Sequence, residues 1–350
     1  MAFRLARALP TCAVAAAIAG AAVAGAPEDD KLLLGAAYPI ETSVSVSAGV
    51  FHWVDSLAGT GGGKTIPAYR REYLDRFGEL GEADREALRA FRDARESYAR
   101  RASGNVLLGA FCASESVGEA LRTARPELTS AEQAAIRGAL DRFLPRYREV
   151  WSQGDVATSF LERARQDPSR RSLALLLTRI AAFFDVDPAA GPRPRVVLVP
   201  VPHGYGTHAE AVGRDLLIEV RPGEGLADEA SVIVHESSHF LFHRIDEARR
   251  RRLEAYAGEA GAHGVAAWNV LLEALPTALG QGVADHEFRP NAWSTASPWY
   301  HLPGVDRYAK AIYKLVNHSL SSGLKLDEAF LREAVRLYPT EEEFGRVPLR

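Results

Sequence analysis

The 350-residue chain has nearly balanced charge, with 42 Lys and Arg against 45 Asp and Glu and a formal net charge of −3 at pH 7. It carries no basic stripe that could displace counterions from phosphates, so the composition disfavours nucleic acid as a partner. Its 47% hydrophobic content at this length can build one large core or two modest ones.

The first 24 residues are typical of a signal peptide. Arg4 and Arg7 precede an apolar stretch from Thr11 to Ala24, and Ala22-Val23-Ala24 supplies the small residues that a signal peptidase needs. The stretch is shorter than the roughly 20 residues that span a bilayer, so we expect cleavage after Ala24 and no stable membrane anchor. The mature chain would be periplasmic or secreted. It would keep Cys112 alone and form no internal disulfide.

The N-terminal half of the mature chain reads mainly as helices, because apolar residues recur at three- and four-residue spacing. The clearest examples are Asp84–Arg101 and Ser130–Trp151. Ser130 and Gln133 are spaced as a capping box at the start of the second helix. The Pro- and Gly-rich segment from Asp187 to Pro194 then predicts a connection into a different kind of structure.

Two runs rich in β-branched and aliphatic residues follow, Arg195–Pro200 and Asp215–Val220, and both predict strands. Asp228 is typical of a cap for a buried helix that runs through Val234 to Phe242. Later helices are expected at Val265–Leu279, Val305–Leu320 and Leu326–Leu337.

The buried helix contains His235-Glu236-Ser237-Ser238-His239, which matches the HExxH pattern. Residues four apart lie on one helical face, one turn from each other, so both imidazoles can reach one zinc ion. Glu236 stands beside the first histidine and could take a proton from a zinc-activated water. The flanks Val232–Val234 and Phe240–Phe242 are apolar. Burying these polar groups without a metal or partners would cost on the order of several kcal/mol.

A catalytic zinc needs a third protein ligand. In the metzincin pattern Phe242 would be a glycine and Ile245 a ligand, and a methionine turn would be required, whereas Met1 is the single methionine. That class is excluded. The remaining features resemble the gluzincins, the thermolysin-like branch of the zincins, and the resemblance implies a glutamate ligand on a later helix.

Two glutamates compete for this role. Glu259 follows His239 by 20 positions, close to the spacing typical of that branch, but it lies in the glycine-broken segment Tyr256–Gly261. Glu273 follows His239 by 34 positions and lies in the apolar helical stretch Ala267–Leu275, where a buried carboxylate needs a reason such as a metal. We therefore expect Glu273 as the third ligand, with Glu259 as the alternative.

The resemblance also implies a Tyr or His after the third ligand that stabilises the oxyanion. Tyr308 is the first choice, because it shares a helical face with Ile312 and Leu315, and His301 is the second. The predicted strand at Asp215–Val220 could be the edge strand that aligns an extended substrate. The full set of oxyanion candidates is Tyr300, His301, Tyr308, Tyr313 and His318.

Together these patterns predict an α+β fold: a signal peptide (1–24), a mainly helical region of unknown role (25–191) and a zincin-like metallopeptidase domain (192–350). The expected reaction is zinc-dependent hydrolysis of a peptide or protein substrate, with Glu236 as general base. Two alternatives remain open: a catalytically inactive zinc-binding module, and a zinc amidase that acts on cell-wall material.

Overall fold

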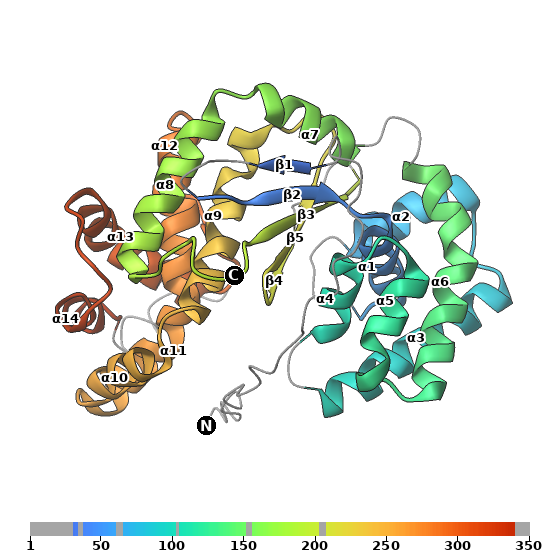
Figure 1. The fold of residues 1–350 in the computed structure, drawn as a ribbon, viewed down its shortest axis with the longest axis horizontal. Helices are drawn as coiled ribbons and strands as arrows, with labels where there is room; N and C mark the ends of the chain where they lie inside the picture. Colours follow the sequence, from blue (N-terminus) through green and yellow to red (C-terminus); the bar gives the residue numbers. More distant parts are fainter. Residues whose placement is uncertain are drawn as a thin grey trace.

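The structure is a computed structural model that describes residues 31–33, 38–60, 66–102, 105–151, 156–202 and 208–339. The expected signal peptide lies outside the described residues. Within these ranges, no helix combines the length and the apolar character needed to cross a membrane. The fold is α+β: many helices surround one small mixed sheet (Figure 1).

The sheet has five strands in the order β1-β2-β3-β5-β4. Its centre is parallel, because β2 pairs with β3 and β3 pairs with β5 in parallel, whereas β1 and β4 run antiparallel to their neighbours at the two edges. The strands are β1 (Lys31–Leu33), β2 (Glu41–Val44), β3 (Arg195–Pro200), β4 (Ala209–Val212) and β5 (Asp215–Val220).

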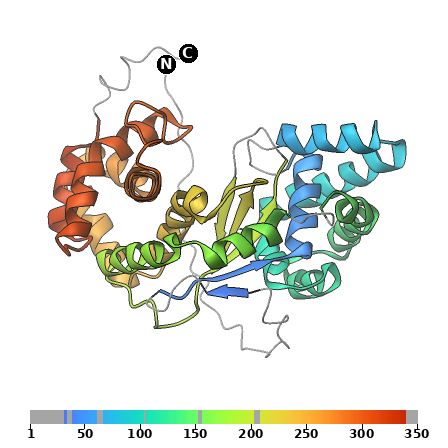
Figure 2. The same cartoon turned by 90° about the horizontal axis from the view of Figure 1, so that it is seen from above.

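The sheet separates two hydrophobic cores, because successive side chains of a strand point to opposite faces. Val197 and Val199 of β3 enter the core formed with the N-terminal helices. Val196 and Leu198 enter the core formed with the C-terminal helices. Figure 1 shows the sheet between these two groups of helices, and Figure 2 shows the same arrangement from above.

The N-terminal helices form the layer on one face. They are α1 (Val46–Ala58), α2 (Ile66–Phe77), α3 (Glu82–Arg101), α4 (Val106–Ala113), α5 (Val117–Ala124), the 3-10 turn η2 (Arg125–Glu127) and α6 (Ser130–Trp151). Their inward residues, among them Trp53, Phe91 and Phe143, are fully buried. This packing accounts for the apolar spacing that predicted helices here.

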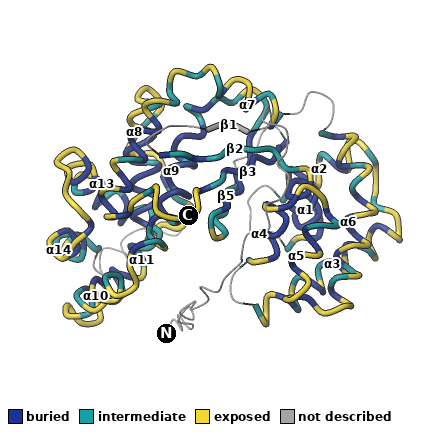
Figure 3. Tube along the Cα trace, in the orientation of Figure 1, coloured by how far each residue is buried: buried dark blue, intermediate teal, exposed yellow. Residues whose placement is uncertain are grey.

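The other face is covered by α7 (Val156–Gln166), α8 (Ser169–Phe184), α9 (Leu226–His243), α10 (Glu247–Gly258), α11 (Gly261–Thr277), the π-helix η3 (Ala278–Ala284), α12 (Asp285–Phe288), α13 (Pro303–Ser321) and α14 (Glu328–Arg336). Helix α9 lies at the middle of this group and is dark blue along most of its length in Figure 3, which marks buried residues.

Three expectations need correction. The sheet does not begin at Arg195, because β1 and β2 from the N-terminal region belong to it. The capping box of α6 is formed one residue earlier than expected, by Thr129 and Glu132. Asp228 lies in the first turn of α9, where its carboxylate accepts a hydrogen bond from the backbone N–H of Gly225 at 2.9 Å.

A buried carboxylate joins the N-terminal helices to the sheet. Glu219 of β5 is fully buried, and its Oε1 lies 2.6 Å from Nε2 of His52 in α1 and 3.1 Å from the hydroxyl of Tyr69 in α2. Its other oxygen accepts a hydrogen bond from the backbone N–H of His208 at 2.7 Å. Buried carboxylates are tolerated when hydrogen bonds satisfy them, so this cluster fixes the helical layer against β5.

The π-helix η3 approaches α9 closely at Gly280. A Cβ atom placed on Gly280 would lie 2.5 Å from the carbonyl oxygen of Ser231 and 3.0 Å from Cβ of His235. Glycine is therefore required here because two backbones meet, and not because of a turn. This contact fixes the distance between η3 and the turn of α9 that carries His235.

Gly280→Ala should destabilise the metal-free protein by about 1–3 kcal/mol, the usual cost of overpacking a closed contact. Gly138→Ala in α6 is the matched control, because its Cβ would meet nothing within 4 Å. Since alanine is the better helix former, this control should stabilise by about 0.5–1 kcal/mol. Urea unfolding of both variants measures the difference, and equal effects would contradict the close approach.

Candidate metal centre

Helix α9 presents His235 and His239 on the same side, one turn apart. Their rings are separated by 5.0 Å between centroids, and the two Nε2 atoms lie 3.2 Å from each other. His235 is 7% exposed, whereas His239 is only partly buried. The i, i+4 spacing in the sequence therefore produces the convergence that was expected from helix geometry.

Glu273 reaches the same point from α11. Its Oε1 lies 3.0 Å from Nε2 of His235, and its Oε2 lies 3.4 Å from Nε2 of His239. These three residues form a group whose ligand atoms all lie within 4.8 Å of one another. In the described part of the chain, no other group of three or more His, Cys, Asp or Glu side chains meets the same condition.

The spacing suits a tetrahedral ion. Ligand atoms about 2.0–2.1 Å from zinc, at tetrahedral angles, stand roughly 3.3–3.4 Å apart. The three contacts between His235, His239 and Glu273 measure 3.0, 3.2 and 3.4 Å. Two imidazoles and one carboxylate are also a donor set typical of catalytic zinc, so the residues present fit this metal.

Glu259, the alternative ligand, lies elsewhere. It is exposed and follows the last residue of α10 as its C-terminal cap, with its backbone N–H directed at the carbonyl groups of that helix. The structure thus brings together His235, His239 and Glu273, and it leaves Glu259 outside the group.

The charges within the group favour an ionised carboxylate. Burial alone would raise the pKa of Glu273, but hydrogen bonds to His235 and His239 outweigh it and hold that pKa far below its usual value. For His235, burial alone would lower the pKa, and the hydrogen bond to Glu273 reverses the direction. An anionic oxygen therefore faces both ring nitrogens, which is the protonation state that Glu273 needs as a ligand.

Glu236 is 8% exposed and follows His235 on the buried helix. Its pKa is raised, chiefly because burial disfavours the charged form, and the negative charges of Glu273 and Glu210 act in the same direction. His235 and His239 partly offset the rise. A carboxyl group with a raised pKa beside the histidines is better suited to accept a proton than an ordinary glutamate is.

The structure places the hydroxyl of Tyr308, the first choice for stabilising an oxyanion, at helix α14. Tyr308 is fully buried, as its helical periodicity predicted, but its hydroxyl donates a 2.9 Å hydrogen bond to the carbonyl of Ala334 in α14. Its ring packs against Tyr338. The inward face of α13 therefore meets another helix at this position, and not the histidines.

Tyr300 lies at the group instead. Its ring is parallel to that of His235, with an angle of 5° between the planes and 6.2 Å between centroids. Burial raises its pKa, and so do the charge of Glu273 and a side-chain hydrogen bond to that residue. Its phenol is therefore a protonated hydrogen-bond donor beside Glu273. His301, the second choice, is exposed next to it.

The position of Tyr300 is set by Asp306 in the first turn of α13. The Oδ1 atom of Asp306 accepts hydrogen bonds from the backbone N–H groups of Trp299 and Tyr300, at 2.5 and 3.2 Å. Its Oδ2 atom pairs with Lys310 at 2.9 Å. A loop residue without periodicity is thus fixed by a carboxylate in the first turn of the following helix, which periodicity along the sequence does not reveal.

The edge strand was also misassigned. Strand β5 is internal, between β3 and β4, and the sheet ends at the antiparallel strand β4 on this side. Strand β4 contacts α9, and its Glu210 is close enough to act on the pKa of Glu236. Asn105, the N-cap of α4, donates a 2.8 Å hydrogen bond to Glu210. The strand edge nearest the histidines therefore belongs to β4.

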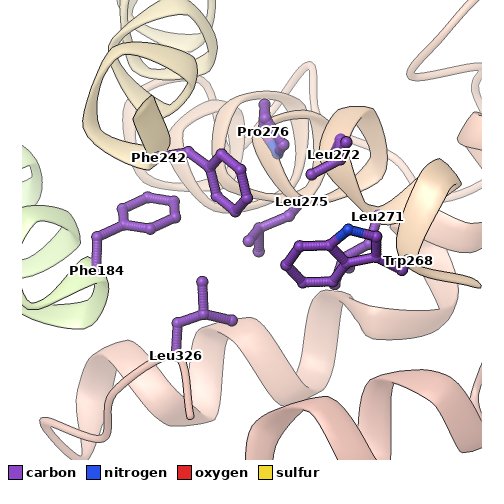
Figure 4. Close-up of a pocket in the computed structure, with 8 residues that line it drawn as sticks. All are labelled: Phe184, Phe242, Trp268, Leu271, Leu272, Leu275, Pro276 and Leu326. Atoms are coloured by element: carbon purple, nitrogen blue, oxygen red, sulfur yellow. The ribbon is translucent and has the colours of Figure 1, made fainter. Parts of the chain in front are cut away.

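Apolar side chains also pack α9 against α11, at Phe242, one turn beyond His239. Figure 4 shows Phe242 between Phe184 of α8 and Trp268 of α11, at centroid distances of 6.4 and 5.9 Å. The hollow among these residues has a volume of about 10 Å³, close to that of a single water molecule, so it is a packing defect and not a ligand site.

Comparison of the chain with models of protein families, with curated proteins and with solved structures found no match in any of the three.

Glu273→Ala should lower zinc affinity by well over tenfold, because even residues that only support a ligand are worth about 10–100-fold. Glu259→Ala is the matched control and should leave affinity unchanged, since that side chain is exposed and outside the group. Competition titration against a chromogenic chelator measures both. A loss in the Glu259 variant with none in the Glu273 variant would overturn the assignment of the third ligand.

Proposed function

We propose that the chain is an exported zinc metallopeptidase of the zincin type, similar to the gluzincins. The observation that carries this proposal is the convergence of His235, His239 and Glu273 from two helices, with Glu236 buried beside them. His235, His239 and Glu273 would hold the ion. When bound, zinc supplies a Lewis acid that lowers the pKa of water and polarises a carbonyl group.

Glu236 has the position and the raised pKa of a general base. It would take a proton from the attacking water and later pass it to the leaving amine. The carboxyl of Glu273 is held anionic by both histidines, so it is unsuited to proton transfer and suited to binding a cation. The two glutamates therefore have different roles, which their surroundings set.

Tyr300 would donate its phenolic hydrogen bond to the oxyanion as the carbonyl carbon becomes tetrahedral. Its parallel stacking with His235 keeps it next to the ligands, and Asp306 holds its backbone from the far side. A donor placed in advance is worth more than one that must reorganise during the reaction.

The substrate proposed is an extended peptide. Strand β4 ends the sheet beside α9, and the outer edge of a strand can pair with a peptide backbone in the manner of an added strand. An amide of cell-wall material remains the alternative substrate, and an inactive zinc-binding module the alternative function. The buried base Glu236 favours an enzyme, because a structural zinc site does not need it.

Glu236→Gln should retain zinc and lower kcat by about 10²- to 10⁴-fold, the usual contribution of a general acid–base group. The assay digests a peptide library and a cell-wall preparation side by side, with zinc content measured on the same samples. Undiminished hydrolysis by the Glu236 variant would remove the mechanism. A wild-type protein that binds zinc but cleaves neither material would favour the inactive module.

Tyr300→Phe should lower kcat by about 10²- to 10³-fold while zinc affinity changes little. Tyr308→Phe is the matched control: it loses one buried hydrogen bond, which should cost about 1 kcal/mol of stability. Its kcat should equal that of the wild type. Steady-state kinetics on one peptide tests both, and a larger loss of kcat at Tyr308 than at Tyr300 would reverse the assignment.

A further inference from the structure

We infer that Gln281, on the π-helix η3, is the positioning residue that orients the imidazole of His235 and sets its tautomer for metal binding. This inference rests on the proposed zinc site and deepens it. Gln281 belongs to neither helix that carries the ligands, and the sequence pattern did not single it out. Gln281 would act on the metal site only by orienting His235, and it would contact neither the ion nor the substrate.

The first observation is a pair of complementary buried atoms. Nδ1 of His235 and Oε1 of Gln281 are both buried, and neither makes a well-formed hydrogen bond within the described residues. Buried polar atoms are rarely left unpaired, because the loss of solvation costs on the order of 1–3 kcal/mol. One atom can be a donor and the other is an acceptor.

The second observation is that the two side chains lie within reach of each other. The two side chains are close enough to interact, but neither Nδ1 of His235 nor Oε1 of Gln281 has a hydrogen-bond partner of good geometry within the described residues. The close approach at Gly280, the preceding residue, brings the backbone of η3 against the turn of α9 that carries His235. The orientation of Gln281 therefore follows from backbone packing.

The third observation is that Gln281 is itself held in place. The indole N–H of Trp293 donates a 3.0 Å hydrogen bond to its backbone carbonyl. The residue after Gln281 is also closely packed. A Cβ atom on Gly282 would lie 2.7 Å from the ring of Tyr313 in α13, so α13 fixes η3 at this position as well. The wider π-helical turn is a feature often found at functional sites, where it redirects one side chain.

The chemistry explains why this contact matters to a metal. A neutral imidazole that offers Nε2 to an ion must carry its proton on Nδ1, and that N–H needs an acceptor in a buried site. Nε2 of His235 is the atom that faces Glu273 and His239. Nδ1 is the buried ring nitrogen left without a partner, and an amide oxygen of Gln281 in contact with it would stabilise the tautomer that binds the ion.

Zinc affinity of the purified full chain tests the inference without relying on activity. Gln281→Leu removes the acceptor at similar size and should weaken zinc binding by about 10–100-fold. Gln281→Glu keeps an acceptor oxygen and should bind zinc within a few-fold of the wild type. Thr277→Val is the matched control, since the Thr277 hydroxyl is bonded to the backbone carbonyl of Glu273 and not to a ligand side chain. It should bind as the wild type does.

The outcomes separate the inference from the proposed function. A wild-type protein without zinc affinity would overturn both. A wild-type protein that binds zinc, with a Gln281→Leu variant that binds equally well, would overturn the inference alone. Equal losses in the leucine and glutamate variants would indicate a packing role and would also overturn it.

If the Gln281→Leu variant does not fold, a measurement on the wild-type protein still tests the inference. In zinc-loaded wild-type protein with 15N-labelled histidine, NMR should show His235 protonated at Nδ1, with that proton shielded from exchange. An Nδ1 proton in rapid exchange with solvent, or a proton found on Nε2, would overturn the inference.

Discussion

The burial of helix α9 is the constraint on which the site depends. The helix packs against β4 and β5 on one side and against α11 and η3 on the other, so it has little face that reaches bulk water. Burying a polar side chain on this helix is therefore costly unless it finds a hydrogen-bond partner. Ser238 bonds back to the carbonyl of Val234, whereas His235 and His239 turn to Glu273. The convergence of these three side chains is thus a consequence of how two helices satisfy each other's polar groups.

The sequence was informative where the chemistry is local or where burial makes a polar residue conspicuous. Helical spacing was enough to bring His235 and His239 together, and the apolar surroundings of Glu273 favoured it over Glu259 despite the less typical spacing.

The same reasoning failed at Tyr308. Periodicity shows that a residue points inward but not which element it meets, and here that element is α14. Tyr300 and Gln281 gave no periodic signal, since one lies in a loop held by Asp306 and the other on a π-helix. Strand β1 was missed because it has only three residues. Strand β2 was missed because it is short and mostly polar, and its parallel pairing with the distant strand β3 stabilises it.

The buried cluster around Glu219 gives the N-terminal helices a role in the shape of the site. Glu219 is bound by α1 through His52 and by α2 through Tyr69, and it also holds the backbone of His208 just before β4. Asn105, the N-cap of α4, holds Glu210 on that strand. The strand edge nearest the histidines is therefore supported from behind by three helices of the N-terminal layer. These helices act on the geometry around Glu236 without contributing a ligand.

The register between β2 and β3 has a consequence for the order in which the molecule assembles. Glu41 pairs with Arg195, so the sheet closes only after all the helices between them have been synthesised. Strand pairs so distant along the chain form slowly, because the entropy of closing the long loop is lost before the strand contacts provide any stabilisation. Until then, the N-terminal helices lack Val197, Val199 and Leu217, which complete their core from the sheet side. A nascent chain that ends before residue 200 presents an open apolar face and an unpaired β2 edge, both of which promote aggregation. Assembly of the histidine-bearing helix onto the sheet is thus a late event, and the early part of the chain depends on being kept apart from other chains until it occurs.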